Sequence, residues 1–166
     1  MEYKFKAWVK PVIEDGEVVY TGCMVDVWEI DFKRRKIIYF EPFDILPMVG
    51  KKEELSFDEI ELLPYIGLND INGKEIYLGD LVMVADHTSW EGLYKVVWDE
   101  ESLMYVLEDA YGNREKLCEF EEYLKKGNSY ENPEIIKNWG RWWVMNRAER
   151  RRTVRKGITA KDLHTI

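Results

Sequence analysis

Residues 65–84, YIGLNDINGKEIYLGDLVMV, restrict the possible folds of this chain more than any other segment. Asn72-Gly73 is a strong β-hairpin signal, because both residue types tolerate the positive φ that a type I′ turn requires. Gly79-Asp80 breaks the chain again before the apolar run 81–84. The segment therefore predicts two strands and two turns of a compact β unit. It contains no nucleophile, metal-ligand cluster or phosphate-binding loop.

Short segments with strand character recur along the rest of the chain. Residues 3–9 alternate between apolar and polar side chains, which is typical of a half-buried strand. Asp15-Gly16 and the basic run 33–36 mark turns between later strands. Antiparallel strands at this spacing predict a mainly β fold built on a small antiparallel barrel. The other expected strands are residues 18–28, 37–40, 60–66, 93–98, 103–107 and 115–120.

Two connecting segments carry distinct signals. Pro42 and Pro47 exclude long regular structure from residues 41–54. The segment is nevertheless apolar enough to form an ordered loop over the barrel or toward a partner. Ser56 and Glu59 fit a capping box, so a single helical turn is expected before the next strand.

Charge is distributed unevenly over three expected portions of the chain. These are an N-terminal β-rich portion (1–58), the barrel portion (59–138) and a Trp/Arg-rich, helical, basic C-terminal extension (139–166). The extension has eight Lys/Arg and two Asp/Glu, a net +6, so the total of −8 leaves −14 for residues 1–138. An acidic body repels nucleic acid and favours partners with basic surfaces. The alternative is that this charge serves only solubility.

The composition limits the cellular setting. No apolar run is long enough to cross a bilayer, and the N-terminus MEYKFKAW is unlike a signal peptide. The two cysteines, Cys23 and Cys118, permit one disulfide, but reduced, packed thiols are the simpler interpretation. We expect a cytoplasmic protein without membrane contact.

The residues that most often perform chemistry form no recognisable site. His87 and His164 are the only histidines, and neither has a second ligand at metal-binding spacing. The segment around Asp70 superficially resembles a calcium loop, but Leu68 and Gly79 would then occupy its two essential carboxylate positions. The many carboxylates single out no pair. We therefore expect no metal, no cofactor and no enzymatic activity.

The strongest candidates for partner binding lie near the C-terminus. Three tryptophans in five residues make a docking anchor for a protein or a second copy of the chain, or else pack back on the barrel. The arginines that follow would contact nucleic acid nonspecifically, clamp an acidic surface, or form a dispensable extension. The candidate residues are Trp139, Trp142, Trp143, Arg147, Arg150, Arg151, Arg152 and Arg155.

Four segments of the chain are distinctive: KFKAW (4–8), YIGLNDINGKEIYLGDLV (65–82), VVWD (96–99) and GNSYENPE (127–134). In these segments the chain resembles the YopX family of small bacteriophage and prophage proteins. The resemblance implies a β-rich fold with an SH3-like barrel portion, in a family without an established enzymatic activity. Residues 31–54 fall in a variable region of the family pattern, and residues 139–166 lie outside it.

These observations predict a non-enzymatic phage or prophage accessory protein in the bacterial cytoplasm. Its expected partner is a host protein with a basic surface, such as a nucleic-acid-handling or defence factor. A nucleic-acid-binding protein that uses the basic C-terminal tail is the alternative function. A homo-oligomer is compatible with the tryptophan cluster.

Overall fold

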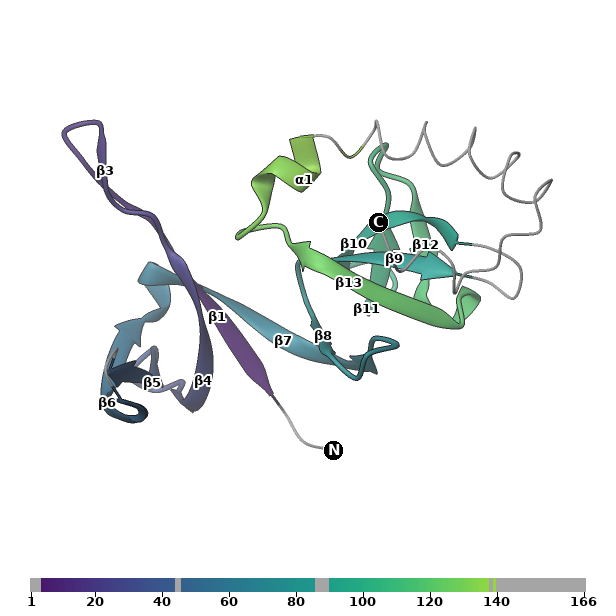
Figure 1. The fold of residues 1–166 in the computed structure, drawn as a ribbon. Coiled ribbons are helices and arrows are strands. Elements are labelled where there is room, and N and C mark those ends of the chain that lie inside the picture. The colour runs from purple at the N-terminus through teal and green to yellow at the C-terminus, as the bar shows by residue number, and fades with distance from the viewer. Residues whose placement is uncertain (1–3, 44–45, 86–89, 138, 140–166) are drawn as a thin grey trace. The chain divides into compact units, whose positions relative to one another are not determined.

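The computed structural model describes residues 4–43, 46–85, 90–137 and 139, and their regular secondary structure is mainly β (Figure 1). Two compact units are present, unit 1 (Met1–Tyr65) and unit 2 (Ile66–Ile166). Every described strand pairing is antiparallel. The elements are β1 (Phe5–Val9), β2 (Val12–Glu14), β3 (Glu17–Tyr20), β4 (Cys23–Asp31), β5 (Lys36–Phe43), β6 (Leu46–Ser56), β7 (Ile60–Asn69), β8 (Glu75–Tyr77), β9 (Asp80–Ala85), β10 (Trp90–Asp99), β11 (Met104–Glu108), β12 (Arg114–Lys116), β13 (Glu122–Asn128) and α1 (Pro133–Lys137).

Unit 1 is built on one sheet whose strands lie in the order β6-β5-β4-β1-β7. Its core lies on one face, where Ala7, Ile37 and Ile60 are buried. Strict alternation along β4 would place Ile30 on the opposite face from Val25 and Val27. A bulge after Val27 shifts the register, and Ile30 joins the same core cluster. The beginning of β7 belongs to this sheet, and its end pairs with β8 in unit 2.

The predicted capping box is confirmed. Phe57–Glu59 forms one 3₁₀ turn between β6 and β7, with Ser56 as its N-cap. The Ser56 hydroxyl accepts from the Asp58 amide at 3.3 Å, and the Ser56 amide donates to the Glu59 carboxylate at 2.8 Å. This local signal was readable because all its partners lie within four residues.

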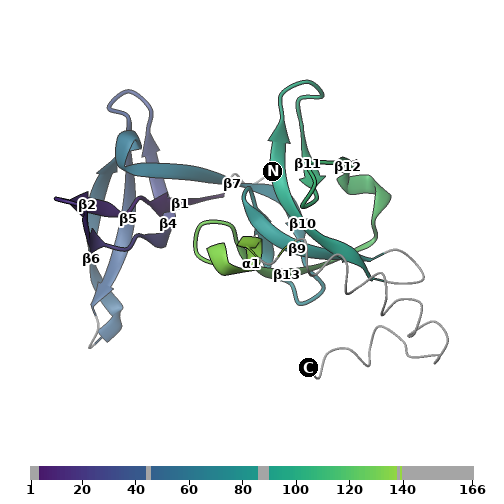
Figure 2. The same ribbon diagram turned by 90° about the horizontal axis from the view of Figure 1, so that it is seen from above.

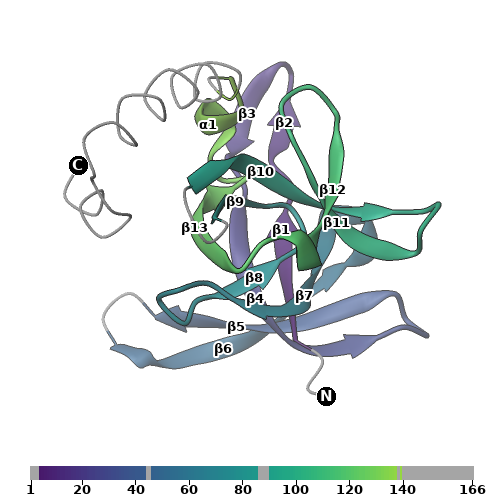
Figure 3. The same ribbon diagram turned by 90° about the vertical axis from the view of Figure 1, so that its right-hand side faces the viewer.

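The prediction of an irregular loop at residues 41–54 is wrong. β5 and β6 form a long hairpin that pairs residues 36–43 with residues 46–56 (Figure 3). Both prolines fit this hairpin. Pro47 lies on an edge strand and Pro42 lies at a register shift, which are the two places where a sheet tolerates proline.

Unit 2 contains a five-stranded sheet in the order β12-β11-β10-β9-β13 (Figure 2). Alternation along β9 supplies two cores. Val82 and Val84 face a cluster with Ile76, Tyr94, Val96, Leu107 and Tyr123. Leu81 faces the other way, into a cluster with Leu93 and Trp139 that Ile135 and Ile136 of α1 also reach. The sheet is therefore covered on both faces.

The type I′ turn predicted at Asn72-Gly73 is wrong, although a hairpin turn does form there. Gly73 has a φ of 79°, but Asn72 is not among the residues with positive φ. Asp70 instead organises the turn, because its backbone pairs with Lys74 and its carboxylate accepts the Asn72 and Lys74 amides. The type I′ geometry occurs at Asp15-Gly16, where both residues have positive φ.

The mainly β, antiparallel prediction is confirmed, but its finer points are not. No sheet in the described ranges closes on itself, so an SH3-like barrel is not confirmed. The apolar residues of the segment 134–143 recur at helical spacing, and the part of it that the structure describes contains a short helix, α1 (Pro133–Lys137). The predicted helical, basic extension lies outside the described residues, apart from Trp139.

Candidate functional site

Buried polar groups are the first place to look for chemistry, and those of unit 2 serve the fold. Asp80 is almost fully buried and accepts the Tyr77 amide at 2.8 Å and the Asn128 side-chain amide at 2.9 Å. The Lys125 ammonium lies 2.6 Å from the same carboxylate. This network joins β9 to β13, and it leaves the carboxylate fully engaged.

Asp70 and Asp109 are likewise occupied in turns. Burial tends to raise the pKa of Asp70, but hydrogen bonds from the Lys74, Asn72 and Lys125 amides outweigh it and hold that pKa below its ordinary value. Asp109 accepts the amides two and four residues ahead, as Asp70 does. These two aspartates therefore act as turn formers.

The described ranges contain no group of side chains arranged for metal or thiol chemistry. No group of three or more His, Cys, Asp or Glu side chains there converges closely enough to hold a metal ion. His87 and His164 lie outside the described residues. Cys23 and Cys118 are free, and both are exposed rather than packed as expected.

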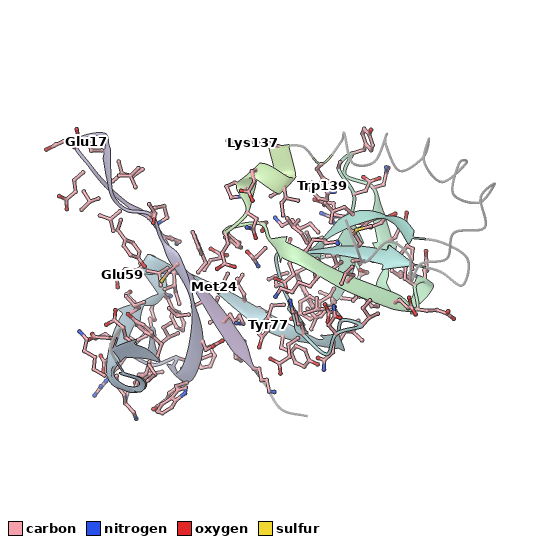
Figure 4. All side chains as sticks on the ribbon, viewed as in Figure 1. Glu17, Met24, Glu59, Tyr77, Lys137 and Trp139 are labelled. Atoms are coloured by element: carbon pink, nitrogen blue, oxygen red, sulfur yellow. The ribbon has the colours of Figure 1, made fainter. Side chains whose placement is uncertain are left out.

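The feature of unit 1 best suited to binding is the β2–β3 hairpin, residues 12–20, which we call the arm. It extends the β1–β4 hairpin past its last register pair, Val9 with Cys23. Beyond that pair, β2 and β3 form a separate two-stranded ribbon. Figure 1 shows the arm projecting from the sheet, and Glu17 marks its far end in Figure 4.

The arm exposes an unusual amount of apolar surface. Ile13 is 62% exposed, Val18 59% and Val19 63%. Val12 and Tyr20 are also exposed. Because consecutive strand residues point to opposite faces, the apolar runs Val12-Ile13 and Val18-Val19 cover both faces of the ribbon. A two-stranded ribbon of this kind has no core of its own.

The end of the arm is acidic. Glu14 and Glu17 lie directly opposite each other in the ribbon, and Asp15 occupies the turn between them. Like charges in register across two strands destabilise a hairpin. A cationic group at the end of the arm would relieve this repulsion. The arm therefore combines an apolar shaft with a preference for a basic neighbour.

The base of the arm is fixed to the sheet by two contacts. Gly22 has a φ of 83°, and a Cβ there would lie 2.7 Å from Cζ2 of Trp8, so the close approach requires glycine. The Tyr20 hydroxyl donates to the Cys23 sulfur at 2.8 Å. The pKa of Tyr20 is raised to about 12, with this hydrogen bond as the largest cause and burial as the second. The arm thus leaves the sheet from a defined base.

Of the predicted site residues, the structure describes Trp139. Its side chain is 8% exposed and lies in the cluster with Leu81 and Leu93 (Figure 4). The indole N–H donates to the Leu93 carbonyl at 2.7 Å. This placement corresponds to the alternative in which the segment packs back on unit 2. The others lie outside the described residues: Trp142, Trp143, Arg147, Arg150, Arg151, Arg152 and Arg155.

Sequence reasoning missed the arm. A strand with one buried face alternates apolar and polar residues, whereas residues 12–13 and 18–20 are continuously apolar beside a two-residue turn. Continuous apolar residues also occur in strands buried on both faces, so this pattern alone does not reveal exposure. The signal that the sequence did contain was the shortness of the two segments, which have too few residues to pack against a second sheet.

The comparisons place the chain in a family. The YopX protein family model matches residues 4–137, and the chain belongs to that family. No curated protein matches it. A crystal structure of protein EF1440 from Enterococcus faecalis is similar, with 19% sequence identity and a TM-score of 0.40. The match covers 82% of this chain and 99% of that one.

Proposed function

We propose that this protein is a non-enzymatic phage or prophage accessory protein that binds a host protein through the arm. Membership of the YopX family supports the phage or prophage setting. The observation that most directly supports binding through the arm is its exposed apolar shaft, formed by Ile13, Val18 and Val19, which ends in the Glu14–Glu17 pair. A complementary partner presents an apolar groove with lysine or arginine at one end.

The two parts of the arm have different roles in this proposal. Burial of the shaft stabilises the complex, since apolar surface contributes roughly 25 cal/mol per Å² removed from water. The acidic end steers the encounter and selects basic partners, and salt screens that contribution. High salt should consequently slow association more than it speeds dissociation.

The same charge pattern supports a cytoplasmic role beside nucleic-acid-handling proteins, whose basic surfaces suit the acidic end. No described helix is long and apolar enough to span a membrane. The buried carboxylates Asp70 and Asp80 are engaged in structure, which supports a binding protein over an enzyme.

The test is capture of partners from bacterial lysate, followed by binding measurements with the purified candidate. Ile13→Thr combined with Val19→Thr keeps β propensity but removes apolar surface, and should abolish capture. Met104→Thr, at an exposed strand position of unit 2, is the matched control and should leave capture intact. Glu14→Gln with Glu17→Gln should lower the association rate, while Glu100→Gln with Glu101→Gln should not.

Binding that survives the threonine variant, or is lost equally in the Met104 control, would contradict the proposal. Circular dichroism of each variant verifies the fold. Because the altered side chains are exposed, unfolding temperatures close to that of the parent are expected.

A further inference from the structure

Three non-glycine residues in the described part of the chain have a positive φ: Asp15, Arg35 and Leu103. This left-handed conformation brings Cβ close to the following carbonyl oxygen, so it is unfavourable for most residue types. Aspartate tolerates it in turns, because its short side chain can form hydrogen bonds with nearby backbone amides. The residue type therefore explains Asp15, whereas Arg35 and Leu103 need another reason.

Two hairpin loops of the protein are built in the same way. Residues 32–35 join β4 to β5, and residues 100–103 join β10 to β11. Asp31 and Asp99 precede the two loops, and each carboxylate accepts the amide three residues ahead at 2.9 Å. The fourth and last residue of each loop is the left-handed one. The side chains at this last position can therefore be compared directly.

The side chain of Arg35 has contacts that offset its unfavourable backbone. Its guanidinium lies 3.3 Å from the Asp58 carboxylate and 5.8 Å from the centroid of the Phe57 ring. Leu103 is instead 72% exposed, and it belongs to none of the core clusters formed by the described residues. Backbone strain and an exposed leucine are both unfavourable in the isolated protein, so we look for the role of Leu103 outside the fold.

The hairpin tip that carries Leu103 is negatively charged. Residues 99–104 include three carboxylates and no basic side chain. An ion pair brings the guanidinium of Arg114 to this tip, which leaves a net charge of −2. Glu100 and Glu101 are exposed, and within the described ranges neither forms an ion pair. These two carboxylates are therefore available to a basic partner.

A second exposed apolar side chain lies at the same end of the hairpin. Trp98 of β10 pairs with Tyr105 of β11, and their rings meet edge to face with centroids 5.1 Å apart. The indole is exposed although this contact holds it in place. We call Trp98, Glu100, Glu101 and Leu103 the Leu103 tip. A complementary surface offers an apolar pocket with basic side chains at its rim.

We infer that the Leu103 tip docks on a protein partner, with Leu103 in an apolar pocket and Glu100 and Glu101 facing lysine or arginine at its rim. Burial of the leucine side chain stabilises the complex, although its exposure destabilises the free protein. A nucleic acid does not fit this surface, because its phosphates and the two carboxylates repel each other. The tip belongs to unit 2 and the arm to unit 1, so this inference concerns a second partner and does not depend on the arm.

Leu103→Gly tests whether the leucine serves the fold. Glycine adopts a positive φ without strain, so this variant should unfold about 2–4 °C above the parent. Arg35→Gly is the matched comparison, since it relieves the same strain but loses the contacts with Asp58 and Phe57. Its unfolding temperature should rise less. A lower unfolding temperature for Leu103→Gly would overturn the inference, because the leucine would then stabilise the fold. Equal rises would overturn it too, because the contacts of Arg35 would then offset nothing.

Photocrosslinking tests the docking itself. The photoreactive amino acid p-benzoylphenylalanine, placed at position 103 of the full-length protein and irradiated in bacterial lysate, should form one discrete adduct. Mass spectrometry should locate the crosslink in an apolar pocket beside lysine or arginine. Glu100→Gln with Glu101→Gln should lower the adduct yield. Unmodified Leu103→Gly should compete for the adduct less well than the unmodified parent does.

Two controls separate this surface from others. Tyr111 is exposed in the loop between β11 and β12, and the same photoreactive residue placed there should not give the adduct. Ile13→Thr combined with Val19→Thr should leave the adduct intact, so this inference and the function proposed for the arm can fail independently. An adduct that is absent, equally formed from position 111, or lost in the arm variant would overturn the inference. A crosslink to residues 140–166 of the same chain would also overturn it.

Discussion

Single aspartates determine much of the local geometry. Asp70 and Asp109 each begin a turn in which glycine stands three residues later, at Gly73 and Gly112. The spacing Asp-x-x-Gly was visible in the sequence, and it predicts this turn better than Asn72-Gly73 alone does. The type I′ prediction was wrong because it considered only Asn72 and Gly73. It ignored the Asp70 carboxylate, which accepts the amides of Asn72 and Lys74.

Replacement of Asp80 tests the buried network. Asp80→Ala leaves the Lys125 ammonium and the Asn128 amide without their acceptor. We expect the free energy of unfolding of unit 2 to fall by about 3–5 kcal/mol, the usual result of removing one partner from a buried ion pair. Urea unfolding followed by tryptophan fluorescence measures it.

Asp26→Ala is the control for this prediction. The Lys6–Asp26 pair also joins two strands, but the Asp26 side chain is 79% exposed. Removing the Asp26 carboxylate should lower the free energy of unfolding by less than about 1 kcal/mol. Similar losses in the free energy of unfolding at both positions would show that burial does not determine how strongly these ion pairs stabilise the protein.

At the level of elements, short segments depend on their neighbours. α1 has five residues, too few to be stable alone, and it is held through Ile135, Ile136 and the nearby Trp139. The sequence predicted a helix here because the apolar spacing is local. It left the role of Trp139 open, because the cluster that receives it comes from β9 and β10, far away in the chain.

Trp139→Ala should therefore act on both stability and the helix. We expect a loss of about 3–5 kcal/mol, typical of a buried tryptophan truncated to alanine. The amides of α1 should lose hydrogen-exchange protection together. Trp98→Ala, at a half-exposed position in contact with Tyr105, should cost about 1 kcal/mol. Retained protection of α1 in Trp139→Ala would contradict the anchoring role.

For the whole molecule, the sequence predicted the strand-rich class and the family, but only part of the architecture. Strands and caps depend on nearby residues, so they were readable. The edge position of Pro47 and the register shift at Pro42 were not readable, and for that reason the two prolines suggested a loop where β5 and β6 pair. Exposure was also unreadable, since whether Val19 is covered depends on every other element.

Alkaline pH should destabilise the protein through Tyr123. Burial raises the pKa of Tyr123 from 10.0 to about 12. Because the folded-state pKa lies above the unfolded one, this contribution is complete below pH 10 and is lost as the pH rises to 12. It amounts to on the order of 2–3 kcal/mol.

Tyr123→Phe isolates this contribution from those of the other tyrosines. Unfolding free energies measured at several alkaline pH values should decline less steeply in the variant than in the parent. Parallel declines would show that Tyr123 ionises in the folded protein as easily as in the unfolded chain.

The acidic end of the arm has a consequence for the protein before it meets any partner. Two exposed apolar ribbons would tend to pair edge to edge when copies of the chain collide. Glu14, Asp15 and Glu17 place three negative charges at the tip of each ribbon, and these repel one another between molecules. The same residues that favour a basic partner thus act as gatekeepers against self-aggregation. They allow the protein to expose the apolar shaft of the arm and still remain dispersed in solution.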